Sequence, residues 1–185
     1  MLISPARKIL NYIWSPNGQY IAFTSKVQSE DQQNTAEVQQ EPAPVLRGKV
    51  YERTTPKAEG AGWWDGQYSH LFVYEMTSGE ITQVTSGLWN ISAPAWSPDS
   101  QYLSFISKQV EDEELDADLL YFTDVYSIRW GESDLFKVTD SSLAISQFSY
   151  SPDGQQLILI ASDHEYGSGS HNSLYAVPVH RGSPG

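Results

Sequence analysis

One short hairpin motif occurs three times in this sequence, and the repetition limits the possible folds more than any other feature. Pro fixes φ at the first corner of a tight turn, Asp or Asn bonds the local backbone, and Gly accepts positive φ. Apolar residues stand five and seven positions after each Pro, in the alternation of a β-strand. Each copy therefore predicts strand, turn, strand. The copies are Trp14-Ser15-Pro16-Asn17-Gly18, Trp96-Ser97-Pro98-Asp99-Ser100 and Tyr150-Ser151-Pro152-Asp153-Gly154, and the apolar pairs are Ile21 and Phe23, Leu103 and Phe105, and Leu157 and Leu159.

A second hairpin pattern follows the first two copies and begins after the third. His70–Tyr74 and Ile81–Thr85 flank one turn, and Asp124–Ile128 and Leu135–Thr139 flank the next. The distance from the first to the last residue is 15 positions in both cases. Gly and Ser occupy the turns, as in other hairpins. The third copy starts the same pattern with Ser173–Val177.

Four antiparallel strands per repeat are typical of a β-propeller blade. We predict an all-β fold, a β-propeller segment of about three four-stranded antiparallel blades that form one domain over residues 1–185. Blade 1 spans about 10–86 with an insertion at 26–69, blade 2 about 90–140, and blade 3 about 144–185 without its last strand. Propellers close with roughly 4 to 8 blades, so we expect a segment of a longer propeller. A free-standing chain that dimerises into a ring is the alternative.

Charge and composition exclude several classes of function. The chain has 23 acidic and 11 basic residues, a formal net charge of −12, which argues against nucleic acid as a partner. It has no Cys, so disulfides, thiolate nucleophiles and Cys-ligated zinc are excluded. No stretch approaches the roughly 20 apolar residues of a membrane span, and no signal peptide is evident in Met1–Trp14. We therefore expect no membrane partner and a cytoplasmic location.

The hairpins resemble the propeller repeats of the TolB, tricorn and prolyl oligopeptidase groups. The stretch Val45–Thr85 separates these groups, because it carries a basic-aromatic segment, then a Gly-rich turn, then the strand pair that begins at His70. This order is similar to the acylaminoacyl-peptidase branch of the prolyl oligopeptidase family. The segments are Lys49-Val50-Tyr51-Glu52-Arg53, Gly60-Ala61-Gly62, His70-Leu71-Phe72-Val73-Tyr74 and Thr77-Ser78-Gly79-Glu80.

The resemblance implies the non-catalytic propeller of a cytoplasmic serine peptidase, above an α/β-hydrolase domain that would be its partner. The propeller would gate and position short peptide substrates. The nucleophile motif Gly-x-Ser-x-Gly occurs nowhere in the 185 residues. We therefore assign no catalytic residue, cofactor or metal to this chain, and we expect it to be inert alone. A TolB-like module that binds protein partners is the alternative function.

Two inserted segments carry candidate contact residues. Trp63 and Trp64 could form an apolar wall against a peptide or a hydrolase domain, although packing against their own blade is the simpler interpretation. Glu113 and Glu114 belong to a run with six acids in eight residues, Glu111–Asp118, which could receive a substrate ammonium group or be a solvated loop. The residues expected to be structural are Trp14, Pro16, Trp96, Pro98, Tyr150 and Pro152.

The histidines do not form a metal motif in the sequence. His164-Glu165 begins like a zincin helix, but a second His is missing and Gly167 and Gly169 disfavour a helix there. His70, His171 and His180 are scattered, so a metal site requires the fold to gather them.

The incomplete repeat count leads to an expectation of self-association. We expect the apolar pairs that follow each motif Pro to pack between neighbouring blades. The first and last blades each lack one neighbour, and exposed apolar faces are rare on soluble monomers. We therefore expect the isolated segment to form dimers or larger species.

Overall fold

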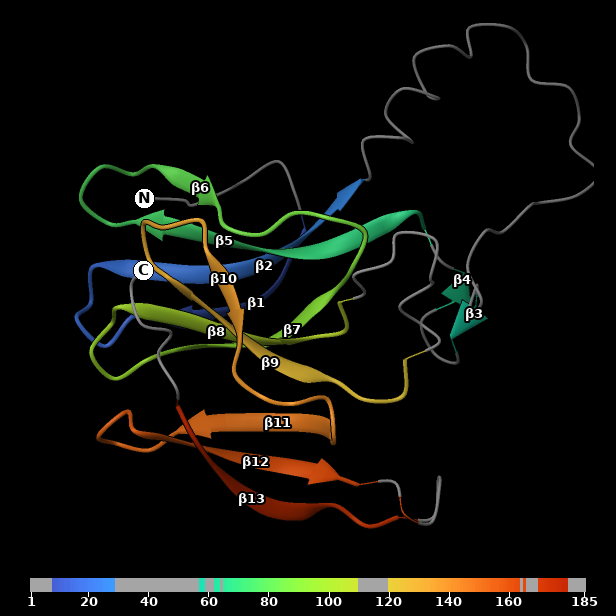
Figure 1. The fold of residues 1–185 in the computed structure, drawn as a ribbon. Coiled ribbons are helices and arrows are strands. Elements are labelled where there is room, and N and C mark those ends of the chain that lie inside the picture. Colours follow the sequence, from blue (N-terminus) through green and yellow to red (C-terminus); the bar gives the residue numbers. More distant parts are fainter. Residues whose placement is uncertain are drawn as a thin grey trace, which may run out of the picture.

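The structure, a computed structural model, describes residues 8–28, 57–58, 62–63, 65–109, 120–163, 165 and 170–179, which form three stacked antiparallel sheets and one short hairpin (Figure 1). Sheet 1 has the order β1 (Ile9–Trp14), β2 (Tyr20–Gln28), β5 (Gln67–Glu75), β6 (Ile81–Gln83). Sheet 2 has the order β7 (Ile91–Trp96), β8 (Tyr102–Ser107), β9 (Asp124–Arg129), β10 (Leu135–Lys137). Sheet 3 contains β11 (Ala144–Tyr150), β12 (Gln156–Ser162) and β13 (Ser173–Pro178). These described residues include no helix, and the predicted all-β propeller segment is confirmed.

The insertion in sheet 1 leaves the register of the sheet intact. β2 and β5 pair over nine residues, from Tyr20 opposite Glu75 to Gln28 opposite Gln67. Between them, β3 (Lys57–Ala58) pairs with β4 (Gly62–Trp63) as a separate hairpin. β2 and β5 therefore extend further toward the inserted segment than the repeat pattern predicts.

In the second and third copies, the residues five and seven positions after the motif Pro face the preceding sheet. Leu103 and Phe105 lie in the core between sheets 1 and 2, and Leu157 and Leu159 lie in the core between sheets 2 and 3. Each of these four side chains is 0% exposed. The same rule turns Ile21 and Phe23 of sheet 1 away from sheet 2, into a smaller cluster with Phe72 and Tyr74. The predicted contact between blades thus holds for the second and third copies.

The far face of sheet 3 is only partly covered. The sequence suggests that β12 is buried on both faces, but Ile158 and Ile160 are half-buried, whereas Leu157 and Leu159 are fully buried. The reason is that one face of β12 packs on sheet 2 and the described residues place no sheet against the other.

The three motif turns share one hydrogen-bond pattern, which explains the motif Ser. The hydroxyl of Ser15 accepts the N–H of Tyr20 at 2.9 Å and donates to the Asn17 side chain at 2.7 Å. Ser97 and Ser151 repeat both bonds in their own turns. Each turn therefore satisfies its backbone groups internally, which stabilises a tight hairpin.

The second turn departs from the motif at Ser100, where the other copies have Gly. The φ values are +71° at Gly18, +68° at Gly154 and +61° at Ser100, so all three turns adopt the left-handed conformation. That conformation costs a non-Gly residue about 1–2 kcal/mol. The Ser100 hydroxyl offsets the strain by accepting the N–H of Asn17 at 3.0 Å, which links the turns of sheets 1 and 2.

Substitutions at Ser100 test this link. Ser100→Ala keeps the strain and leaves the Asn17 N–H without its acceptor, so we expect a loss of about 1–2 kcal/mol in the free energy of unfolding. Ser100→Gly removes the bond and the strain together, so we expect a change within about 0.5 kcal/mol. Urea unfolding of both variants measures the difference, and a Gly variant as unstable as the Ala variant would contradict this account.

Candidate functional site

The segments between the second and third strands of each sheet leave the fold at one end, which we call the insertion end. They follow Gln28 of β2, Ser107 of β8 and Ser162 of β12. Figure 1 shows the ends of these strands on the right, opposite the motif turns. The two longest segments, 29–66 and 108–123, therefore start from neighbouring sheets at the same end of the molecule.

A lysine anchors the base of both long segments. Lys26 and Lys108 each stand ten positions after a motif Pro. The Lys26 ammonium lies 2.5 Å from the Asp65 carboxylate, and the Lys108 ammonium donates to the Leu120 carbonyl at 2.7 Å. Burial alone would raise the pKa of Asp65, but the Lys26 ammonium and the Gln67 N–H together hold it below its usual value. These contacts fix where each insertion begins or ends.

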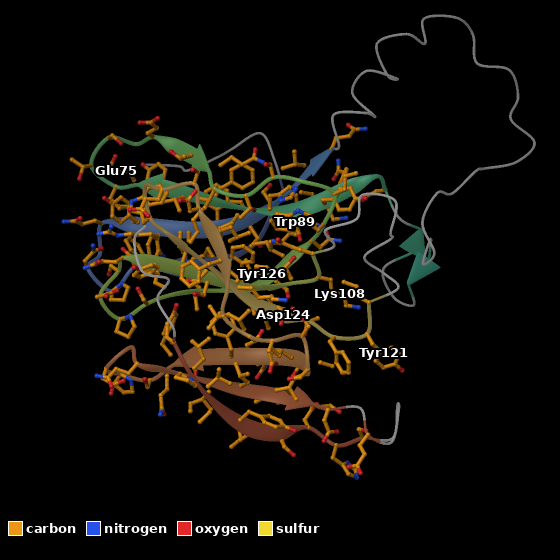
Figure 2. All side chains as sticks on the ribbon, viewed as in Figure 1. Glu75, Trp89, Lys108, Tyr121, Asp124 and Tyr126 are labelled. Carbon is orange, nitrogen blue, oxygen red and sulfur yellow. The ribbon has the colours of Figure 1, made fainter. Side chains whose placement is uncertain are left out.

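An aromatic side chain projects from the insertion end. Tyr121 is 60% exposed and meets Phe122 edge-on, with ring centroids 6.4 Å apart. Figure 2 shows Tyr121 near Lys108, on the side of the molecule opposite Glu75. An exposed, amphipathic ring on an anchored segment is a suitable contact for a peptide or a protein. The constant spacing of Lys26 and Lys108 from the motif Pro was a usable sequence signal for this site, whereas Tyr121 carried none.

The predicted contact residues belong to these same two segments. Trp63 lies in β4, where its backbone pairs with that of Lys57, but its side chain is outside the described residues. Trp64, Glu113 and Glu114 also lie outside them. Their roles therefore remain predictions, and only their attachment to the insertion end is placed.

The repeat-position aromatics occupy equivalent places with unequal exposure. Trp14 pairs with Ile21, Trp96 with Leu103 and Tyr150 with Leu157. The rings of Trp96 and Tyr150 therefore face the preceding sheet, whereas Trp14 lies on the face of sheet 1 turned away from sheet 2. Trp96 is 7% exposed and stacks on Tyr20, and the Tyr150 hydroxyl bonds the buried Ser104 hydroxyl. Trp14 is 53% exposed. Pro16 and Pro152 are exposed and Pro98 is half-buried at the turns.

A cleft of about 480 Å³ lies at the other end, between the turns of sheets 1 and 2. The Arg129 guanidinium in its wall is 2.9 Å from the Glu132 carboxylate, so its charge is balanced locally. The cleft offers hydrogen-bonding side chains and two aromatic rings, and its lining residues include no His, Lys or Cys. Its walls are formed by Asn17, Gln19, Tyr20, Asp99, Ser100, Gln101, Arg129, Trp130, Gly131 and Glu132.

The described part of the chain gathers no metal site. Within it, no three His, Asp or Glu side chains approach closely enough to hold an ion. His70 is buried, His171 is exposed, and His164 and His180 fall outside it. Among the same residues, no helix has the length and apolar character needed to span a membrane.

Comparison with known families matches residues 26–166 to the dipeptidyl peptidase IV (DPP IV) N-terminal region. An uncharacterized peptidase, YuxL of Bacillus subtilis (strain 168), is 35% identical over 98 residues, which cover 53% of this chain and 14% of that protein. The chain thus spans a small part of its relative's length.

Solved structures resemble the fold. The acylaminoacyl peptidase of Pyrococcus horikoshii superposes with a TM-score of 0.60 at 14% identity, over 92% of this chain and 24% of that one. An acylaminoacyl peptidase in complex with Z-Gly-Gly-Phe-chloromethyl ketone gives 0.59 at 11% identity, over 93% and 24%. At these identities the likeness shows the propeller fold.

Proposed function

Since the chain belongs to the family of dipeptidyl peptidase IV N-terminal regions, we propose that it is the non-catalytic propeller portion of a serine peptidase related to prolyl oligopeptidase. The family match over residues 26–166 is the observation that carries this proposal. The peptidase relative and the acylaminoacyl-peptidase fold support it. The hydrolysis itself would belong to an α/β-hydrolase domain of the same protein, because this chain has no Gly-x-Ser-x-Gly.

The role proposed for the propeller is to admit and position short peptides. The contacts proposed for this role are the exposed Tyr121 ring and, earlier in the sequence of the same segment, the acidic run that contains Glu113 and Glu114. Carboxylates bind ammonium groups through charge-assisted hydrogen bonds, so this run suits the free amino group of a peptide. Trp63 and Trp64 would add an apolar wall.

The coding sequence on either side of this chain is the first test. We expect further blades and a hydrolase domain with Gly-x-Ser-x-Gly, followed by Asp and His. The complete protein should cleave short peptides and leave a folded protein with the same exposed sequence intact. A complete protein without a hydrolase domain would contradict the proposal and favour the TolB-like binding module.

Substitution of Tyr121 tests the contact at the insertion end. In the complete peptidase, Tyr121→Ala should raise KM for short peptides about five- to thirtyfold with little change in kcat, as expected for about 1–2 kcal/mol of lost binding. Met76→Ala is the control, because Met76 is 43% exposed in a turn at the opposite end. Equal effects of the two substitutions would count against a peptide contact at Tyr121.

A further inference from the structure

His70 of sheet 1 and Asp124 of sheet 2 hold the same position in the repeat. In both sheets a Thr stands fifteen residues after this position. Its hydroxyl accepts a hydrogen bond from the backbone N–H of the residue that directly follows His70 or Asp124. Thr85 accepts from Leu71 at 2.9 Å, and Thr139 accepts from Val125 at 3.0 Å. The same hydroxyls lie 3.3 Å from His70 Nδ1 and 2.6 Å from an Asp124 carboxylate oxygen.

The residue seventeen positions later ties this position to the chain that enters the next sheet. His70 Nε2 donates to the Gly87 carbonyl at 3.0 Å, whereas the Ser141 N–H donates to the Asp124 carboxylate at 2.7 Å. Gly87 and Ser141 both have positive φ, +125° and +61°. The backbone thus presents a carbonyl to His70, whose Nε2–H donates, and an N–H to Asp124, whose carboxylate accepts. We call the two arrangements, His70 with Thr85 and Gly87, and Asp124 with Thr139 and Ser141, clasps.

The contacts of His70 define its tautomer. The Gly87 carbonyl can only accept, so Nε2 carries the proton and Nδ1 accepts from the Thr85 hydroxyl. The ring is 3% exposed, and Trp89 meets it edge-on at 5.4 Å. Trp89 also stacks on Phe105 of sheet 2, with ring centroids 6.2 Å apart. The His70 clasp therefore contacts a Trp89 ring that lies in the packed interface between sheets 1 and 2, which we call the seam (Figure 2).

The charged groups around the two clasps differ. Ser25 lies opposite His70 on β2, and the next residue, Lys26, points to the other face and pairs with Asp65. His70 takes part in none of the ion pairs between the described residues. Burial is the main cause that lowers the pKa of His70, and the bond to Gly87 opposes it in part. Asp124, in contrast, has the Lys137 ammonium 3.7 Å away.

We propose that His70 makes the seam between sheets 1 and 2 sensitive to acid, whereas the equivalent position between sheets 2 and 3 holds no imidazole. Protonated His70 would carry an N–H on Nδ1, so that this nitrogen would change from an acceptor to a donor toward the Thr85 hydroxyl. The Thr85 hydroxyl proton would lose its acceptor, and a buried charge would have no carboxylate partner. The clasp then opens and releases Gly87–Trp89.

The pH range follows from the direction of the shift. Because the pKa of His70 is lower in the closed clasp than in the free side chain, the open state binds the proton more readily. The clasp is fully stable above the usual histidine pKa near 6.5 and weakens as the pH falls below it. Any effect on substrate entry depends on the proposed function, but the opening of the seam does not.

Hydrogen exchange on the 185-residue chain at pH 7.5 and 5.5 provides the test, with rates corrected for intrinsic exchange. We expect opening at 86–90 to increase on acidification, by up to about tenfold per pH unit for one proton. Exchange at 140–143, the matching connection, should not change. An equal increase at both connections, or none at 86–90, would overturn the proposal.

Two variants isolate the imidazole. His70→Gln keeps an N–H donor for Gly87 but does not titrate, so it should abolish the pH effect at 86–90, whereas His171→Gln should leave it intact because His171 is exposed. A pH effect that persists in His70→Gln would overturn the proposal. NMR titration of the wild-type chain is independent of the folding of any variant. It should give a midpoint for His70 below the usual histidine pKa near 6.5, shared by the amides of 86–90. A His70 that titrates at or above that value would overturn the proposal as well.

Discussion

Replacing Phe105 with Ala is expected to lower the free energy of unfolding by about 3–5 kcal/mol, the range for a large aromatic side chain removed from a close-packed core. Phe105 is 0% exposed and lies between Trp89 and Tyr126, with ring centroids 6.2 and 6.3 Å away. It faces sheet 1 from the middle of sheet 2, so the substitution empties the seam between the two sheets. Whole domains have about 5–15 kcal/mol of stability, and this loss would be a large share.

Urea unfolding followed by circular dichroism measures the free energy of unfolding of the Phe105→Ala variant and of the unsubstituted chain. Tyr121→Ala is the matched control, because that ring is 60% exposed and its removal should change stability by less than about 0.5 kcal/mol. A loss below about 1 kcal/mol at Phe105 would show that the two sheets do not depend on this contact.

The repeat made the fold predictable, because turn chemistry and strand alternation act locally. Pro16, Pro98 and Pro152 located three hairpins, and Leu103 and Leu157 were correctly expected in the cores between sheets. Exposure was less predictable. Trp14 and Trp96 are the same residue in the same motif, yet one is 53% exposed and the other 7%. The difference lies in whether a preceding sheet covers the ring, which the motif itself does not encode.

The candidate site was predictable only in outline. The insertions were located from unequal repeat spacing, but Trp63 and Glu113 lie on segments for which the repeat gives no template. The equal separation of His70 from Thr85 and of Asp124 from Thr139 was visible in the sequence. That each pair clasps the chain at Gly87 or Ser141 depends on how the backbone of the connection turns, and spacing alone does not define that turn.

The isolated chain is expected to self-associate through the outer faces of its first and last sheets. On sheet 1, Trp14 and Tyr12 are 53% and 64% exposed and share the face turned away from sheet 2. On sheet 3, Leu174 is 74% exposed, on the face opposite the core shared with sheet 2. In a propeller both faces would meet neighbouring blades, so each of them can pair with the other in a second copy. Two such contacts close into a two-fold ring.

Light scattering across a dilution series should therefore show dimers that dissociate on dilution and depend weakly on salt, since apolar burial drives the contact. Leu174→Asp should raise the dissociation constant at least about a hundredfold, because each of the two contacts loses about 1.5–3 kcal/mol. Leu88→Asp is the control, since Leu88 is 55% exposed in the connection between sheets 1 and 2. A chain that stays at its monomer mass of 20.7 kDa at high concentration would refute the contact. If both substitutions raised the dissociation constant equally, association would follow overall surface hydrophobicity. The proposed contact between the outer faces of sheets 1 and 3 requires a larger effect of Leu174→Asp than of Leu88→Asp.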